Sequence, residues 1–242
     1  MGESAKLLSP NKTVLMPDKD ADCPMAHMVD EYFIARLRKE YEDLCVVCYI
    51  NSTAEIKTMS DVCVTSSNAK RIVEALPNKN ILFIPDQNLG KHIAELVPSK
   101  NFLFCNGYCP THYRITPEDI LTAKEKHPGA PVLIHPECKP ECVELADYAG
   151  STSGIIDYAT NDQEHDEFIV VTEIGVIHEM EKRNPGKKFY PATDKLVCPN
   201  MKKNTLEKVR DCLKNNTNQV ELDEEFMEKA KKPLERMHEL AK

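Results

Sequence analysis

The feature that most constrains this chain is an internal repeat marked by three Cys-Pro dipeptides. They stand at Cys23-Pro24, Cys109-Pro110 and Cys198-Pro199, which places the three cysteines 86 and 89 residues apart. The first two dipeptides are followed by the same order of segments: an amphipathic segment, an apolar run, a second helical pattern, a hydroxyl cluster and another apolar run. A repeat of this length is one supersecondary unit used more than once, so we expect several similar units.

The apolar runs inside the repeat predict parallel sheets. Residues 46–50 and 81–84 in one copy, and residues 131–134 and 168–171 in the other, are continuously apolar rather than alternating. Such runs, separated by helical patterns, are typical of strands buried on both faces in α/β folds. A further short strand is expected at residues 13–16. Because right-handed crossovers bring the loops after parallel strands to one edge, we expect the polar motifs to collect there.

The repeat also predicts the domain organisation. Residues 24–109 and 110–198 form two similar α/β units, and residues 1–23 join the C-terminal residues 199–242 in an incomplete first unit. Residues 3–8 have the pattern of the last turns of a helix, so we expect further sequence upstream. The tail contributes two helices.

Composition excludes several classes of protein. The formal net charge of −8 argues against a nucleic-acid binder that relies on phosphate neutralisation. No apolar run approaches the roughly 18 residues of a membrane span. Ten cysteines in 242 residues are too sparse for a disulfide scaffold. We therefore expect a cytoplasmic protein that uses some of its cysteines as metal ligands.

The cysteines of the three dipeptides are candidate ligands of one metal centre. Equivalent positions in pseudo-symmetric units converge near a common axis, and a proline after the cysteine suits the first turn of a helix, whose N-terminus lowers the pKa of a thiol. Three thiolates without a fourth suit an iron–sulfur cluster with one open iron better than a closed zinc site. Simple packing, the state of most free cysteines, is the alternative, and spacing alone leaves both open.

The other seven cysteines are expected to pack. Cys45 and Cys48 fit a C-x-x-C pattern, but in a strand these two positions face opposite ways. Cys138 and Cys142 could meet only if the segment between them were helical. The remaining three show no pattern and are Cys63, Cys105 and Cys212.

Polar residues follow two of the predicted strands. His135 and Glu137 stand where an acid–base pair would be useful, although such a loop more often caps the next helix. Tyr49 and Asn51 are either the walls of a pocket or ordinary strand-end residues.

Two hydroxyl clusters stand 86 residues apart, at residues 65–67 and 151–153, and each precedes a helical pattern. A helix N-terminus with hydroxyl groups can bind an anion, whereas the simpler interpretation is N-capping. Recurrence at equivalent positions favours a shared anionic ligand.

Together these motifs resemble the quinolinate synthase family, also called quinolinate synthetase A. The resemblance covers almost the whole chain, in the family's order. The matching stretches are MPD at 16–18, DCPMA at 22–26, YINSTAE at 49–55, DVCVTSSNA at 61–69, PDQNLG at 85–90, NGYCPTH at 106–112, HPEC at 135–138, GSTS at 150–153, TEIG at 172–175 and CPNMKKNT at 198–205. It implies three-layer α/β/α units with short parallel sheets around a pseudo-threefold axis, the first unit being incomplete here.

The resemblance implies a cofactor and a reaction. Cys23, Cys109 and Cys198 would hold a [4Fe-4S] cluster with one iron left open as a Lewis acid. The family condenses iminoaspartate with dihydroxyacetone phosphate, releasing phosphate and water to give quinolinate in de novo NAD biosynthesis. An aspartate-oxidising enzyme is the expected source of iminoaspartate, and neither nucleic acid nor a membrane is an expected partner.

The resemblance also implies roles for single residues. Glu137, His135 and Tyr49 are the implied catalytic residues, with Glu137 as the main proton-transfer group. The implied substrate-binding residues are Tyr49, Asn51, Ser66, His135, Glu137, Ser151 and Thr152.

The chain departs from the family pattern in two ways. Cys198 stands alone, where some members carry C-x-x-C-x-x-C. The family also has a segment before position 1 that supplies a histidine, a tyrosine and a serine to the substrate. Two other interpretations are therefore kept: a non-catalytic iron–sulfur or redox-sensing relative that lost the first unit, and a cluster-free α/β protein that binds a metabolite.

Overall fold

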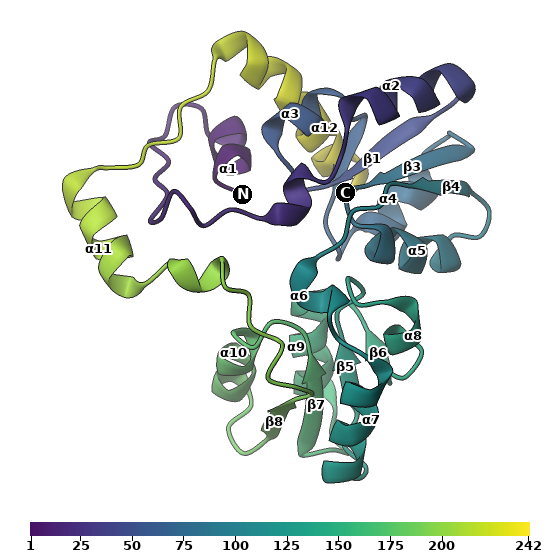
Figure 1. The fold of residues 1–242 in the computed structure, drawn as a ribbon, viewed down its shortest axis with the longest axis vertical. Helices are drawn as coiled ribbons and strands as arrows, with labels where there is room; N and C mark the ends of the chain where they lie inside the picture. The colour runs from purple at the N-terminus through teal and green to yellow at the C-terminus, as the bar shows by residue number, and fades with distance from the viewer. The chain divides into compact units, whose positions relative to one another are not determined.

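In the computed structural model, which describes residues 1–242, the chain folds into two compact units (Figure 1). Unit 1 comprises Met1–Gly107 and Pro199–Lys242, and unit 2 comprises Tyr108–Cys198. Each unit contains one four-stranded parallel sheet with helices between the strands. The predicted α/β class with short parallel sheets is therefore confirmed. The subdivision of unit 1 at residue 23 and the threefold arrangement stay predictions.

Unit 1 is built on a sheet with the strand order β2-β1-β3-β4. The strands are β1 (Cys45–Tyr49), β2 (Val62–Val64), β3 (Asn80–Ile84) and β4 (Asn101–Phe104). The helices are α1 (Gly2–Leu8), η1 (Pro24–His27), α2 (Glu31–Glu40), α3 (Ala54–Thr58), α4 (Ala69–Ala75), α5 (Gln87–Leu96), η2 (Met201–Lys203), α11 (Leu206–Asn215) and α12 (Glu224–Leu240). The C-terminal helix α12 packs against α3 and β2, so the two ends of the chain share one core.

Unit 2 has a sheet with the equivalent strand order, β6-β5-β7-β8. Its strands are β5 (Val132–Ile134), β6 (Tyr148–Ala149), β7 (Glu167–Val171) and β8 (Lys188–Pro191). Its helices are α6 (Pro110–Tyr113), α7 (Pro117–Lys126), α8 (Pro140–Val143), α9 (Thr152–Asn161) and α10 (Val176–Arg183).

The sheet of unit 2 is covered on both faces, as continuous apolar strands require. Along β7, Ile169 and Val171 belong to one core cluster while Phe168 and Val170 belong to the other. Helices α7 and α8 lie on one side of the strands in Figure 1, and α9 and α10 lie on the other. The apolar runs predict this burial on both faces, and the resemblance implies the three layers.

Local signals set where the helices begin. Thr116 and Asp119 form a capping box around Pro117, which occupies the first turn of α7. Asp86 caps α5 by accepting hydrogen bonds from the backbone N–H groups of Asn88 and Leu89, both at 2.9 Å. Short polar side chains therefore fix where these helices begin, and Asp86 does so directly after β3.

One hydrogen-bonding arrangement recurs in both units at an offset of 86 residues. The Asp61 carboxylate accepts from the Val46 N–H at 2.7 Å, and the Asp147 carboxylate accepts from the Val132 N–H at 2.8 Å. In each pair the aspartate N–H donates to the carbonyl of the same valine at 2.9 Å. The repeat thus extends to the bonds that join the central strand to the residue directly before the second strand of each unit.

The expected strand at residues 13–16 is wrong. Leu15 forms only an isolated antiparallel bridge with Gln219, and its neighbours are half-buried. The apolar residues 14–16 therefore lie against the C-terminal segment without joining a sheet. None of the helices has the combination of length and apolar character needed to cross a bilayer.

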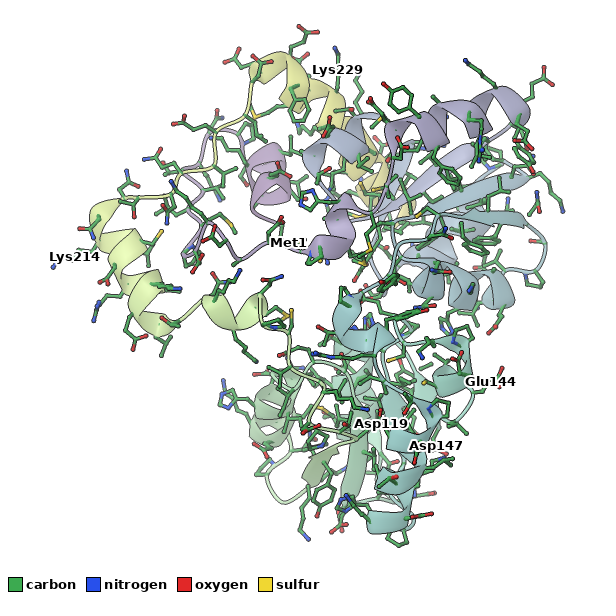
Figure 2. The ribbon with its side chains drawn as sticks, viewed as in Figure 1. Met1, Asp119, Glu144, Asp147, Lys214 and Lys229 are labelled. Carbon is green, nitrogen blue, oxygen red and sulfur yellow. The ribbon has the colours of Figure 1, made fainter.

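Asp147→Ala tests the recurring aspartate, which is labelled in Figure 2 at the start of β6. We expect the free energy of unfolding to fall by about 1.5–3 kcal/mol, because the Val132 N–H loses a charged acceptor. Urea unfolding followed by circular dichroism measures the change. Asp157→Ala, at a largely exposed side chain of α9, is the control and should stay within about 0.5 kcal/mol of the parent. Equal losses for the two variants would contradict the assigned role.

Candidate active site at the carboxyl edges

Nearly all the candidate residues lie in loops that follow parallel strands. In unit 1, Tyr49 ends β1 and the first hydroxyl cluster follows β2. In unit 2, His135 follows β5 and the second hydroxyl cluster follows β6. Because all strands of a sheet point the same way, each unit presents these groups at one edge, which we call its carboxyl edge.

In unit 1, the candidate ligand Cys23 contacts a candidate pocket residue. Cys23 is the residue that precedes η1, and Pro24 is the first residue of that helix. The Asn51 side-chain amide donates to Cys23 Sγ at 3.4 Å, although 28 residues separate the two in sequence. The loop after β1 and the Cys-Pro turn are therefore adjacent in the folded unit.

The loop that carries Asn51 is organised around the ammonium group of Lys57, a side chain of α3 that is 0% exposed. Lys57 Nζ donates to the carbonyls of Ser52 at 2.6 Å and Ile50 at 3.0 Å, and also to the Ser52 hydroxyl at 3.0 Å. The Thr53 carbonyl lies at 3.5 Å. A buried ammonium needs such partners, and here residues 50–53 supply all of them.

In unit 2, three side chains with different donor atoms meet at the carboxyl edge. His112 Nδ1 lies 2.8 Å from Glu137 Oε2 and 3.2 Å from Cys109 Sγ. Cys109 precedes α6 and His112 lies three residues later, so the helical turn brings the imidazole back over the thiol. The sulfur, nitrogen and oxygen atoms all lie within 4.8 Å of one another.

Further contacts fix the orientation of these groups. His112 Nε2 lies 3.0 Å from the Thr172 hydroxyl, at the end of β7. The Glu137 N–H donates to His135 Nδ1 at 3.3 Å, and the two imidazole rings stack with centroids 5.2 Å apart. Glu137 and His112 are each only 6% exposed. The result is a buried carboxylate–imidazole pair that can hold and transfer a proton.

Cys198, the second candidate ligand in unit 2, is tied to the carboxyl edge by Glu173. One carboxylate oxygen of Glu173 accepts from the Cys198 N–H at 3.3 Å, and the other accepts from the Gly175 N–H at 2.8 Å. The helix that follows Cys198 begins later than the proline suggests, because η2 starts at Met201. Cys198 is therefore held by the hydrogen bond from its backbone N–H to Glu173, and not by a helical turn.

The two hydroxyl clusters have the same internal contact. Thr65 Oγ1 lies 2.8 Å from Ser67 Oγ, and Ser151 Oγ lies 3.1 Å from Ser153 Oγ. Ser151 also caps α9 by accepting from the Gly154 N–H at 3.1 Å. Ser151 is thus an N-cap, as the simpler interpretation predicts. The middle residues, Ser66 and Thr152, are half-buried and exposed, respectively.

Burial separates the ten cysteines into two groups. The three candidate ligands are half-buried, whereas the other seven are all buried. The thiols of Cys138 and Cys142 point to different backbone carbonyls, those of Val171 and Ile115, so they do not form a pair. The three cysteines of the Cys-Pro dipeptides are thus the only partly exposed ones.

Burial also controls the pKa values of the packed thiols. It raises the pKa of Cys45 to about 12 and that of Cys142 to about 11. Cys48 is the exception: burial alone raises its pKa, but a hydrogen bond from Cys63 and the charge of Lys57 lower it to about 6. Most of these thiols are therefore unreactive packing groups.

Sequence reasoning gave no role to four residues that build these sites: Lys57, His112, Thr172 and Glu173. The C-x-x-H spacing after Pro110 was a usable signal for His112, because three residues make one helical turn. Thr172 and Glu173 follow an apolar run directly, as His135 does. No local signal marks Lys57, since a lysine in a short polar helix is normally exposed.

Comparison with known proteins identifies related chains over the whole length. The family described as "NadA: Quinolinate synthetase A protein" matches residues 1–239. A protein named quinolinate synthase from Clostridioides difficile is 54% identical over 241 residues, which is 100% of this chain and 79% of that relative. One of the same name from Caldicellulosiruptor bescii is 52% identical over 240 residues, which is 99% of this chain and 79% of that relative. A third, from Methanoregula boonei, is 45% identical over 237 residues, which is 98% of this chain and 78% of that relative.

Lys57→Met keeps the length of the side chain but removes the ammonium donor from residues 50–53. We expect the free energy of unfolding to fall by about 1–3 kcal/mol, because buried carbonyls lose their partner. Urea unfolding measures this, and hydrogen exchange at residues 50–53 should increase. Lys100→Met is the matched control, since Lys100 holds the carbonyls of Leu76 and Asn78 in a loop without candidate residues. Unchanged exchange at residues 50–53 in Lys57→Met would contradict this role.

Proposed function

Because the chain belongs to the quinolinate synthetase A family, enzymes of NAD biosynthesis, we propose that it condenses iminoaspartate with dihydroxyacetone phosphate to give quinolinate. The reaction releases phosphate and water. The observation that supports it best is the separation of the cysteines: three are half-buried in loops rich in polar groups, and seven are buried. Iminoaspartate would come from an enzyme that oxidises aspartate.

The proposed cofactor is a [4Fe-4S] cluster held by Cys23, Cys109 and Cys198. Three thiolates suit a cube with one open iron, and Asn51 adds an N–H donor to one ligand sulfur. When bound, the cluster supplies a Lewis acid that polarises a carbonyl or a departing hydroxyl.

Glu137 is the proposed proton-transfer residue. Its buried carboxylate contacts His112 Nδ1 at 2.8 Å, and Thr172 holds the other ring nitrogen. A proton on Nδ1 is thus shared with the carboxylate while the ring keeps its orientation. His135 orients the Glu137 backbone, and Tyr49 is the proposed catalytic partner from unit 1.

The remaining candidate residues are proposed to bind the anionic groups of the substrates. Ser66, Ser151 and Thr152 stand before or at the start of helices, where hydroxyl and backbone N–H groups favour carboxylate or phosphate. Asn51 lines the pocket beside Cys23. Substrates that carry two carboxylates and a phosphate need several such donors.

Substitution of the candidate ligands tests the cofactor. We expect Cys23→Ala, Cys109→Ala or Cys198→Ala to abolish stable cluster binding in anaerobic reconstitution, because two thiolates seldom retain a cube. Iron content, sulfide content and visible absorption measure this. Cys48→Ala is the control at a packed thiol and should keep the cluster. A full cluster in Cys109→Ala, together with its loss in Cys48→Ala, would refute the ligand assignment.

Glu137→Gln tests the reaction in an anaerobic assay of quinolinate. We expect kcat to fall by about 100-fold or more with KM little changed, because the amide keeps the size but cannot transfer the proton. Ser66→Ala and Thr152→Ala should instead raise KM, since each removes a donor to an anion. Equal kcat for Glu137→Gln and the parent would remove Glu137 from its role. A cluster-loaded chain that forms no quinolinate would favour a non-catalytic iron–sulfur relative.

A further inference from the structure

Three side chains of unit 2 have the composition of a mononuclear metal site. Cys109, His112 and Glu137 contribute one sulfur, one nitrogen and one oxygen, all within 4.8 Å of one another. The histidine and the glutamate are buried and the cysteine is half-buried. Zinc binds these three donor types, and three protein ligands plus an open fourth position is its usual arrangement in reactive sites.

Two of the three distances between the donor atoms are close to those around a tetrahedral zinc ion. Zinc bonds of about 2.0–2.3 Å place neighbouring ligand atoms roughly 3.3–3.6 Å apart. In the structure the nitrogen of His112 lies 3.2 Å from the sulfur of Cys109 and 2.8 Å from the oxygen of Glu137. These two pairs would have to move apart by about 0.4–0.6 Å to admit the ion. The third pair, the sulfur of Cys109 and the oxygen of Glu137, lies within 4.8 Å.

The surroundings also resemble the support that metal ligands need. A histidine ligand typically donates its second ring N–H to an oxygen, which fixes the ring and its tautomer. Here His112 Nε2 lies 3.0 Å from the Thr172 hydroxyl, which leaves Nδ1 for the ion. The Glu137 backbone is held by its bond to His135 Nδ1 at 3.3 Å. His112 and Glu137 are thus both held in place by protein contacts that do not involve the ion.

We propose that Cys109, His112 and Glu137 bind a divalent ion of the zinc class, in competition with assembly of the iron–sulfur cluster. The competition follows because both would use the sulfur of Cys109. The zinc site itself stands on the three donors of unit 2, whereas the competition rests on the proposed cluster ligation by Cys109. In the zinc-bound state, Glu137 would be a ligand and could not transfer protons.

The test titrates the metal-free chain with Zn²⁺ against a chromophoric chelator, and with Co²⁺ to record thiolate charge-transfer and tetrahedral absorption. We expect one tightly bound ion per chain. Cys109→Ala and His112→Phe should weaken binding by more than about 100-fold, and Thr172→Val by about 10–100-fold. Thr172→Val removes only the hydroxyl that contacts His112 Nε2. It therefore still tests the site if the His112→Phe variant does not fold.

Two controls separate this site from the cluster. Cys23 is a proposed cluster ligand but lies in unit 1, outside the zinc site. The Cys23→Ala variant should therefore lose the cluster and keep the zinc. His165→Phe alters another histidine–carboxylate pair of unit 2, with Asp162 at 2.9 Å, and should change neither. Zinc-loaded parent chain should incorporate less iron and sulfide than metal-free chain.

Each contrary result has a defined meaning. Undiminished zinc affinity in His112→Phe, or loss of zinc in Cys23→Ala to the same degree as in Cys109→Ala, would overturn the site. Normal cluster assembly on zinc-loaded chain would overturn the competition. Failure of every variant and of the parent to assemble a cluster, with the zinc results as expected, would refute the proposed cofactor and leave the zinc site standing.

Discussion

The arrangement of this protein depends on the parallel pairing of apolar strands. β1 pairs with β2 and β3, and β5 pairs with β6 and β7, all in parallel. Parallel neighbours cannot be joined by a hairpin, so each connection crosses the sheet as a helix and every strand ends at the same edge. Polar residues that follow these strands are therefore gathered without any direct attraction between them. The candidate chemistry follows from the direction of the strands.

The two units use this constraint with different side chains at equivalent places. Tyr49 ends β1 and Asn51 follows it, whereas His135 and Glu137, 86 residues later, follow β5. The aspartates that bond the central strands and the paired hydroxyls after the second strand are shared by both units. The repeat therefore keeps the framework constant and varies the side chains at the carboxyl edge: amide and phenol in one unit, imidazole and carboxylate in the other.

The sequence predicted the central strands, the order of elements and the carboxyl edges, because continuous apolar runs and a long repeat are strong signals. The outer strands were missed, since β2 has only three residues and β6 two, while β4 and β8 are partly exposed. The run at residues 13–16 was misread because an apolar tetrapeptide does not reveal whether a partner strand exists. Site residues at the ends of β1, β2, β5 and β6 were predicted, whereas Thr172 and Glu173, which follow β7, were given no role. The partners of His112 were not, because contacts between segments 25 and 60 residues apart have no local pattern.

The buried ammonium of Lys57 has a consequence for how the first loop can diverge among relatives. Its acceptors are three backbone carbonyls and one serine hydroxyl, all from residues 50–53. Carbonyl groups are present whatever the side chain, so the identities of Ile50 and Thr53 are only weakly constrained by this contact. The number of residues between β1 and α3 is constrained strongly, since an insertion would displace a carbonyl from the ammonium. Drift in this loop should therefore proceed by exchange of residues and not by change of length.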